Sequence, residues 1–160
     1  MHERYDECPQ GKKNIMTSNA IWFQHPNLAE LNSNQHTLVG HLGIELTEIG
    51  DDFIKARMPV DRRTHQPMGL LHGGASLALA ETLGSMGAYL CVDPAKFNVV
   101  GIEINANHIR AVRDGYVTGV ARPIHRGRTT QLWEIRITDA ADKLVCISRI
   151  TLAVLDKPAA

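Results

Sequence analysis

One long stretch of small and apolar residues constrains the fold of this 160-residue chain more than any other feature. Residues 70–92, LLHGGASLALAETLGSMGAYLCV, predict a helix of roughly five turns that is apolar on almost every side. Such a helix has to be covered on most sides, and residues as small as Gly84 and Gly87 let its neighbours come close. A membrane helix is disfavoured, because Glu81 near its middle would cost several kcal/mol in lipid. We therefore expect a buried helix of a soluble domain.

Strand-like segments lie on both sides of this helix. Residues 38–49 and 53–60 predict a hairpin around the turn at 50–52. After the helix, turn residues at 113–115, 127 and 139–142 separate further strand-like pieces. These later pieces cover residues 98–112, 116–126, 129–138 and 143–155. The fold class expected is α+β, in which five or six strands form a curved antiparallel sheet around one central helix.

The pattern predicts one domain. Residues 1–20 show no apolar periodicity and predict a flexible N-terminal arm. The single domain is expected over residues 21–156, and residues 26–32 predict a short helix near its start.

Composition limits the partners and the compartment. The chain has 17 basic and 17 acidic residues, and a net charge of zero argues against a nucleic-acid partner. Its polar first residues lack the apolar segment of a secretory signal, and we expect a cytoplasmic protein with no membrane partner. The odd number of cysteines, Cys8, Cys91 and Cys146, predicts free thiols. No His, Cys or carboxylate cluster has metal-ligand spacing, so no metal is expected.

Glu81 is the strongest single candidate for chemistry. It lies in the middle of the apolar helix with no cation within a turn or two, where a buried unpaired carboxylate is expensive. Ser85 follows at the i+4 position and shares its face. A solvated helix position, or an acid satisfied across an interface, remains the alternative for Glu81, and helix packing remains the alternative for Ser85.

The sequence His72-Gly73-Gly74 opens the same helix. The first backbone N–H groups of a helix have no partner within it, and glycines let a ligand approach them closely, which suits the oxygen of a reacting carbonyl. A plain turn is the alternative. Gly73 and Glu81 are eight residues apart, or about 12 Å along a helix axis. One carbonyl cannot touch both, so a site that uses both must combine two subunits.

Arginines follow the helix without forming a basic run. Arg110, Arg126, Arg128 and Arg149 lie on or beside predicted strands. The turn sequence RGRTT at 126–130 has the forked cations and hydroxyls that suit phosphate oxygens. A solvated hairpin end is the alternative interpretation.

The segment THQPMGLLHGGASLALAETLGSMGAYLC resembles the hotdog-fold acyl-CoA thioesterases. The resemblance extends from Trp22 to Leu155. The subgroup that is most similar contains the 4-hydroxybenzoyl-CoA and 1,4-dihydroxy-2-naphthoyl-CoA thioesterases, with the pattern Q-P-x-G-x-x-H-G-G-x-S-x-x-x-x-E. That pattern is complete here, between Gln66 and Glu81.

The resemblance implies hydrolysis of an aryl-CoA thioester, with a role in menaquinone biosynthesis, by a homodimer with shared active sites that pairs into a homotetramer. Coenzyme A is then part of the substrate, and no separate cofactor is expected. Glu81 is the implied nucleophile or general base, and Gly73 supplies a backbone N–H to the thioester oxygen. His72 and Gln66 position the thioester, and Ser85 holds the water. The residues implied to line the pantetheine and nucleotide are Gly101, His108, Ile109, Arg110, Ala111, His125, Arg126, Gly127, Arg128, Thr129 and Thr130.

Two rival functions remain within the same fold. A hotdog-fold dehydratase or hydratase needs a loop histidine followed by Phe-Pro or a His/Asp pair, whereas His65 here precedes Gln-Pro. A non-catalytic acyl-CoA-binding protein that acts as a sensor needs a fused DNA-binding module and a basic segment, and the chain shows neither. The acyl group itself is not determined by these residues, although Met68, Leu77, Met86 and Tyr89 are expected to form the pocket floor.

Overall fold

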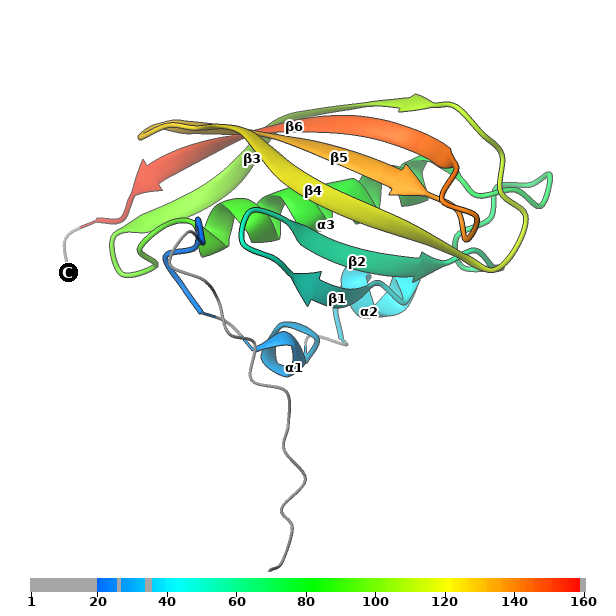
Figure 1. Cartoon of the computed structure of the whole chain (residues 1–160), viewed down its shortest axis with the longest axis horizontal. Helices are drawn as coiled ribbons and strands as arrows, with labels where there is room; N and C mark the ends of the chain where they lie inside the picture. The colour runs from blue at the N-terminus through cyan, green and yellow to red at the C-terminus, as the bar shows by residue number, and fades with distance from the viewer. Residues whose placement is uncertain (1–19, 26, 34–35, 159–160) are drawn as a thin grey trace, which may run out of the picture.

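A six-stranded antiparallel sheet curves over one long helix, α3 (Gly73–Leu90), in the computed structural model (Figure 1). The structure describes residues 20–25, 27–33 and 36–158. The strand order in the sheet is β1-β2-β4-β5-β6-β3, so β1 and β3 form its two edges. The predicted α+β architecture is confirmed. The strands are β1 (Glu45–Ile49), β2 (Ile54–Pro59), β3 (Phe97–His108), β4 (Tyr116–Arg126), β5 (Thr130–Thr138) and β6 (Leu144–Asp156).

One side of α3 packs into the concave face of the sheet. Leu79 and Leu83 have no exposed surface and lie in the hydrophobic core. The predicted close approach occurs at Gly87, where an added Cβ would lie 2.8 Å from Cζ3 of the buried Trp133. No helix in the described part of the chain is long and apolar enough to cross a membrane. The opposite side of α3 is only partly covered. The partly or fully exposed residues of α3 are Gly73, Gly74, Leu77, Ala78, Glu81, Thr82, Ser85, Met86 and Tyr89.

Two short helices precede the sheet, and one of them corrects the sequence prediction. The helix expected at residues 26–32 is present as α1 (Leu28–Leu31). Residues 38–42, however, form the helix α2 (Leu38–Leu42), where we expected strand. Its apolar residues follow a helical repeat, and Gly43 ends it with a left-handed φ of 69°. Only the second half of the predicted strand, β1, pairs with β2 in the expected hairpin.

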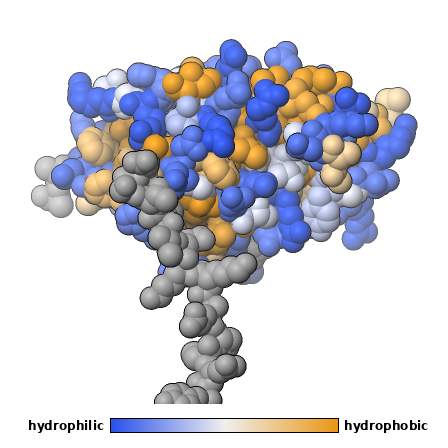
Figure 2. Space-filling view, in the orientation of Figure 1, coloured by the Kyte–Doolittle hydropathy of each residue, from blue (hydrophilic) through white to orange (hydrophobic). Residues whose placement is uncertain are grey.

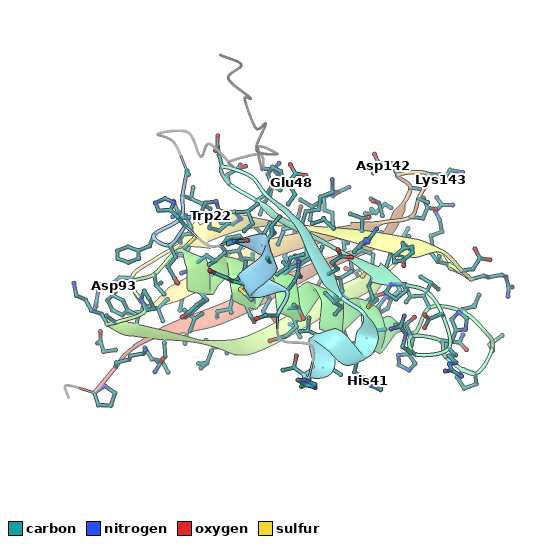
Figure 3. The ribbon with its side chains drawn as sticks, turned by 90° about the horizontal axis from the view of Figure 1, so that it is seen from below. Trp22, His41, Glu48, Asp93, Asp142 and Lys143 are labelled. Atoms are coloured by element: carbon teal, nitrogen blue, oxygen red, sulfur yellow. The ribbon has the colours of Figure 1, made fainter. Side chains whose placement is uncertain are left out.

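The segment Ile21–Gln24 closes the C-terminal end of α3. The backbone N–H groups of Phe23 and Gln24 both donate to the Leu90 carbonyl, at 2.9 and 3.1 Å. Trp22 stacks on Trp133 with ring centroids 6.2 Å apart. Figure 3 places Trp22 and Asp93 towards this end of the molecule and His41 towards the other. The predicted arm at 1–20 lies outside the described residues, apart from Ala20.

The edge strand β3 is exposed along most of its length. Among the described residues it pairs with β6 alone, and its apolar side chains Val100 and Ile102 are 45% and 61% exposed. Figure 2 shows apolar surface along the upper rim of the molecule, where β3 and β6 run in Figure 1. The pairing with β6 shifts between Gly101 and Glu103, which marks a β-bulge at Ile102. A long and partly apolar edge without a covering element is the type of edge that another chain pairs with.

Candidate active site

His72 begins the long helix and is held in one tautomer. It is the N-cap of α3, and its Nδ1 accepts a hydrogen bond of 2.8 Å from the backbone N–H of Gly74. Because Nδ1 is the acceptor, the neutral ring carries its proton on Nε2. This cap leaves the N–H of Gly73 outside the hydrogen bonds within the helix, at the positive end of its dipole. The helix start therefore presents two hydrogen-bond donors, Gly73 N–H and His72 Nε2–H.

Gln66 lies on the loop that leads into the helix, and this loop is tightly closed. The Gln66 side-chain oxygen accepts a short hydrogen bond from the Met68 backbone, so its amide group is left to donate. The backbone of Gln66 bonds to Leu70 at 2.8 Å, and Gly69 provides the left-handed φ of 71° that the turn requires. His72 N–H then donates to the Thr64 carbonyl at 2.8 Å. The loop thus sets the position of Gln66 relative to His72.

Gln66 and Gly73 line a pocket of about 340 Å³ together with the end of β3, whereas His72 lies outside its lining. His108 lies against Gly73, where an added Cβ would be 2.7 Å from His108 Nε2. The structure thereby brings predicted catalytic residues and predicted substrate-binding residues together in one chain. The lining residues are Gln66, Leu70, Leu71, Gly73, Ser76, His108, Ile109, Arg110, Ala111 and Val145.

Glu81 lies further along α3 and does not line this pocket. The helix is continuous from Gly73 to Glu81, which separates the two residues by about 12 Å along its axis. The Glu81 side chain is half-buried, and its Oε1 lies 2.8 Å from where a Cβ of Gly101 would be. Within the described ranges, no hydrogen bond or ion pair engages the carboxylate, and Ser85 lies one turn on. Each subunit therefore holds the two halves of the predicted site apart.

A second pocket, of about 390 Å³, lies at the C-terminal end of α3. Gly127 and Arg128 line it with the rings of Phe23 and Phe97. The predicted nucleotide-binding residues are therefore divided, since Arg110 belongs to the first pocket and Arg128 to the second.

The other predicted binding residues of the β4–β5 hairpin contact neighbouring parts of the chain and do not line the second pocket. The Arg126 guanidinium donates to the Ile21 carbonyl at 3.1 Å and so is directed towards the N-terminal segment. The backbone carbonyls of Thr129 and Thr130 accept from Val154 and Gly127. The ring of His125 lies close to Gly127. Of the predicted residues in this hairpin, only Gly127 and Arg128 line the pocket.

Several residues that line the two pockets were not predicted from the sequence. Ser76, buried to 2% exposure, follows Gly73 by three residues and faces the same pocket. Its position inside the motif, as a polar residue in an apolar helix, was an available signal. Phe23, Phe97 and Val145 carried none, because only the fold brings these distant residues to the two pockets.

The cysteines lie apart from the catalytic motif. Burial raises the pKa of both the Cys91 and the Cys146 thiol, although the guanidinium of Arg126 acts in the opposite direction on Cys91. Both thiols are free. In the described ranges, no group of three or more His, Cys, Asp or Glu residues could hold a metal ion.

Comparison with known proteins identifies the family. The family model of the thioesterase superfamily matches residues 68–146. The chain is 53% identical over 137 residues to the putative esterase PA1618 of Pseudomonas aeruginosa, covering 85% of this chain and 94% of that protein. The chain belongs to the thioesterase superfamily. It is also 56% identical over 136 residues to the proofreading thioesterase EntH of Cronobacter turicensis, covering 84% and 98% of the two chains.

Solved structures of other superfamily members match the whole fold. A crystal structure of a mutant of thioesterase PA1618 superposes with a TM-score of 0.85 at 51% identity, covering 86% of this chain and all of that one. Thioesterase HI1161 of Haemophilus influenzae gives 0.82 at 49% identity, covering 87% and 97%. These similarities confirm the predicted hotdog fold and the predicted thioester hydrolase class.

Proposed function

We propose that this thioesterase hydrolyses an aryl-CoA thioester, 1,4-dihydroxy-2-naphthoyl-CoA or a related hydroxyaryl-CoA, to the free acid and CoA. The observation that carries the proposal is the Glu81 carboxylate, which is half-buried on an apolar helix with no partner among the described residues. A carboxylate that no donor or cation engages, on an otherwise apolar helix, is available to contact a substrate. The complete motif from Gln66 to Glu81 supports the same role.

A dimer through β3 would complete the site. Gly73 lies beside His108, and Glu81 lies beside Gly101, on the same edge strand. Antiparallel pairing of two β3 strands about a twofold axis near Ile104 would bring His108 of one strand opposite Gly101 of the other. The partner subunit's Gly73 would then lie near Glu81, which the 12 Å spacing along one helix prevents within a single chain. Two such dimers forming a tetramer stays a prediction.

In this dimer the thioester carbonyl would lie between two helices. The partner's Gly73 N–H donates to the carbonyl oxygen, where negative charge develops in the transition state. The Nε2–H of His72 and the amide of Gln66 fix the orientation of the thioester. As a general base, Glu81 takes a proton from the attacking water, and the proton passes to the CoA sulfur as the C–S bond breaks. As a nucleophile, its carboxylate attacks the thioester carbon and displaces CoA as the thiolate when the C–S bond breaks, and water then hydrolyses the resulting anhydride to the free acid and Glu81.

The two pockets suit the two ends of such a substrate. The first has an apolar lining of Leu70, Leu71, Ile109 and Val145 with a few polar groups, and its volume fits a small acyl group. The second offers the Arg128 cation beside aromatic rings, which suits a phosphorylated nucleotide. A menaquinone pathway and a cytoplasmic location stay predictions.

The test is a panel of aryl- and alkyl-CoA thioesters, with release of free CoA thiol as the readout. We expect hydroxyaryl-CoA thioesters to give the highest kcat/KM and Glu81→Ala to lack activity on all of them. Alkyl thioesters as the best substrates would refute the aryl assignment while leaving the hydrolase class intact.

A further inference from the structure

We propose that Gly101 is a positioning residue for the reaction, because the missing side chain at this point of β3 makes the space that the Glu81 carboxylate occupies. This inference rests on the proposed catalytic role of Glu81. It gives Gly101 a task different from lining the pantetheine.

Gly101 faces the helix. Val99, Ile104 and Ala106 on the same strand pack against the hydrophobic core, and the β-bulge at Ile102 keeps Gly101 on that inner side despite the odd spacing. A Cβ built on Gly101 would meet Glu81 Oε1 at 2.8 Å and Ile150 Cδ1 at 4.0 Å. The strand thus has no side chain at the point where the Glu81 carboxylate approaches it.

The backbone does not require glycine at this position. The described glycines with a left-handed φ are Gly43, Gly69 and Gly115, so Gly101 has a conformation that other residues adopt. Glycine within a strand costs conformational entropy and contributes no packing, and it often marks a close approach of another group. The available reason for glycine here is therefore the space beside Glu81.

This space matters because little else holds the carboxylate. Among the described residues, Glu81 has no hydrogen bond or ion pair to fix its oxygen atoms. An added methyl group at 2.8 Å would push Oε1 away from its place. Displacing a reacting group by about 1 Å can lower the rate by about 10²-fold.

The experiment is a double-variant cycle with Gly101→Ala and Glu81→Asp. We expect Gly101→Ala to lower kcat by roughly 10- to 100-fold with little change in KM, because the acid moves while the binding pockets remain. Glu81→Asp withdraws the carboxylate by one methylene and also lowers kcat. In the double variant the added methyl group faces the space left by the shorter acid. The loss of kcat in the double variant should therefore be at least about tenfold smaller than the product of the two single losses of kcat.

Gly119→Ala is the matched control. Gly119 lies on β4 and faces the same helix, with an added Cβ 2.6 Å from Leu83 Cδ1, but it does not contact Glu81. We expect this variant to lower the thermal midpoint, and Glu81→Asp should not rescue it. If Gly101→Ala fails to fold, the steric explanation requires the Gly101→Ala, Glu81→Asp double variant to fold and hydrolyse substrate.

Two results would overturn the inference while Glu81 keeps its role. One is a kcat for Gly101→Ala within about twofold of wild type when Glu81→Ala is inactive. The other is a double variant whose loss equals the product of the single losses. Full activity of Glu81→Ala would instead refute the proposed function itself, which distinguishes the two failures.

Discussion

His108, the last residue of β3, lies against Gly73, the first residue of α3. The contact fixes one end of the edge strand to the start of the helix, and Gly101 and Glu81 form a second contact between the same two elements. The edge strand therefore carries both halves of the proposed site at a set separation. A second copy of this chain that pairs through β3 brings its own Gly73 and its own Glu81 to the interface.

Removing the acid at residue 81 should abolish turnover and leave the fold intact. We expect both Glu81→Ala and Glu81→Gln to lower kcat on the order of 10³-fold or more, as losses of comparable groups do. A half-buried carboxylate with no partner contributes little to folding, so the thermal midpoint should stay the same or rise. Steady-state kinetics and thermal unfolding measure the two effects. An active Glu81→Gln would show that the carboxylate takes no part in the chemistry.

The role of His72 can be separated from its role as helix cap. His72→Ala removes the hydrogen bond to Gly74 and should cost about 1 kcal/mol of stability in addition to activity. His72→Ser is the matched control, since serine also caps a helix but cannot reach a thioester with a second donor. We expect both variants to lose kcat, by less than Glu81→Ala does, and only the alanine variant to lose stability. Full activity in the serine variant would limit His72 to capping.

The sequence allowed the motif residues to be placed on their elements of the fold better than the predicted CoA-binding residues. Gln66, His72, Gly73 and Glu81 belong to one local motif that runs from a loop into a helix with an unambiguous apolar pattern, and local patterns suffice to place them on these elements. The strand predicted over residues 38–42 was wrong because a short apolar run fits a helix and a strand equally well. The left-handed Gly43 ends the run as a helix, and strand β1 begins only after it.

The predicted CoA-binding residues show what spacing cannot determine. Arg110, Arg126 and Arg128 have the same chemistry in sequence, yet the fold directs them to different surroundings. Arg126 is directed to Ile21, from a segment more than a hundred residues away, and no local signal could reveal that contact. The predicted CoA-binding residues are divided between two pockets because these pockets lie at opposite ends of the helix α3.

Loss of the pocket arginines should weaken CoA binding without slowing the chemistry. Contacts to phosphates bind substrate and transition state alike, so Arg128→Ala should raise KM more than it lowers kcat. Arg110 lines the first pocket, so adding Arg110→Ala in a double variant should raise KM only slightly further. Arg149→Ala, on β6 and outside both pockets, is the control and should leave KM unchanged. An unchanged KM for CoA thioesters in the double variant would contradict the proposed nucleotide position.

Alkylation of the cysteine thiols should leave the hydrolase activity nearly unchanged. Burial raises the pKa of the Cys91 and Cys146 thiols above their usual range, so both stay protonated and unreactive at neutral pH. We expect iodoacetamide at pH 7.5 to leave activity within about twofold of the untreated enzyme. Peptide mass spectrometry identifies which cysteines are labelled. Cys91 lines the second pocket, so labelling it can raise KM; a loss of kcat in proportion to that labelling would contradict the role assigned to Glu81.

Mixing two inactive variants should restore activity if the site spans two subunits. One parent is Glu81→Ala, and the other is the Gln66→Ala, His72→Ala double variant, which avoids placing any new atom against His108. A mixed dimer has one site with every group intact and one site that lacks them all. Complete exchange should recover about a quarter of wild-type activity, because half of the dimers are mixed and each holds one intact site of two.

The mixing experiment depends on exchange, which is measured separately. Native mass spectrometry of one isotope-labelled parent reports the fraction of mixed dimers, and recovered activity should rise in proportion to that fraction. Each parent incubated alone is the control and should stay inactive. Full exchange with no recovered activity would place Gln66, His72 and Glu81 of one site in one chain, against the separation of Gly73 and Glu81 along one continuous helix.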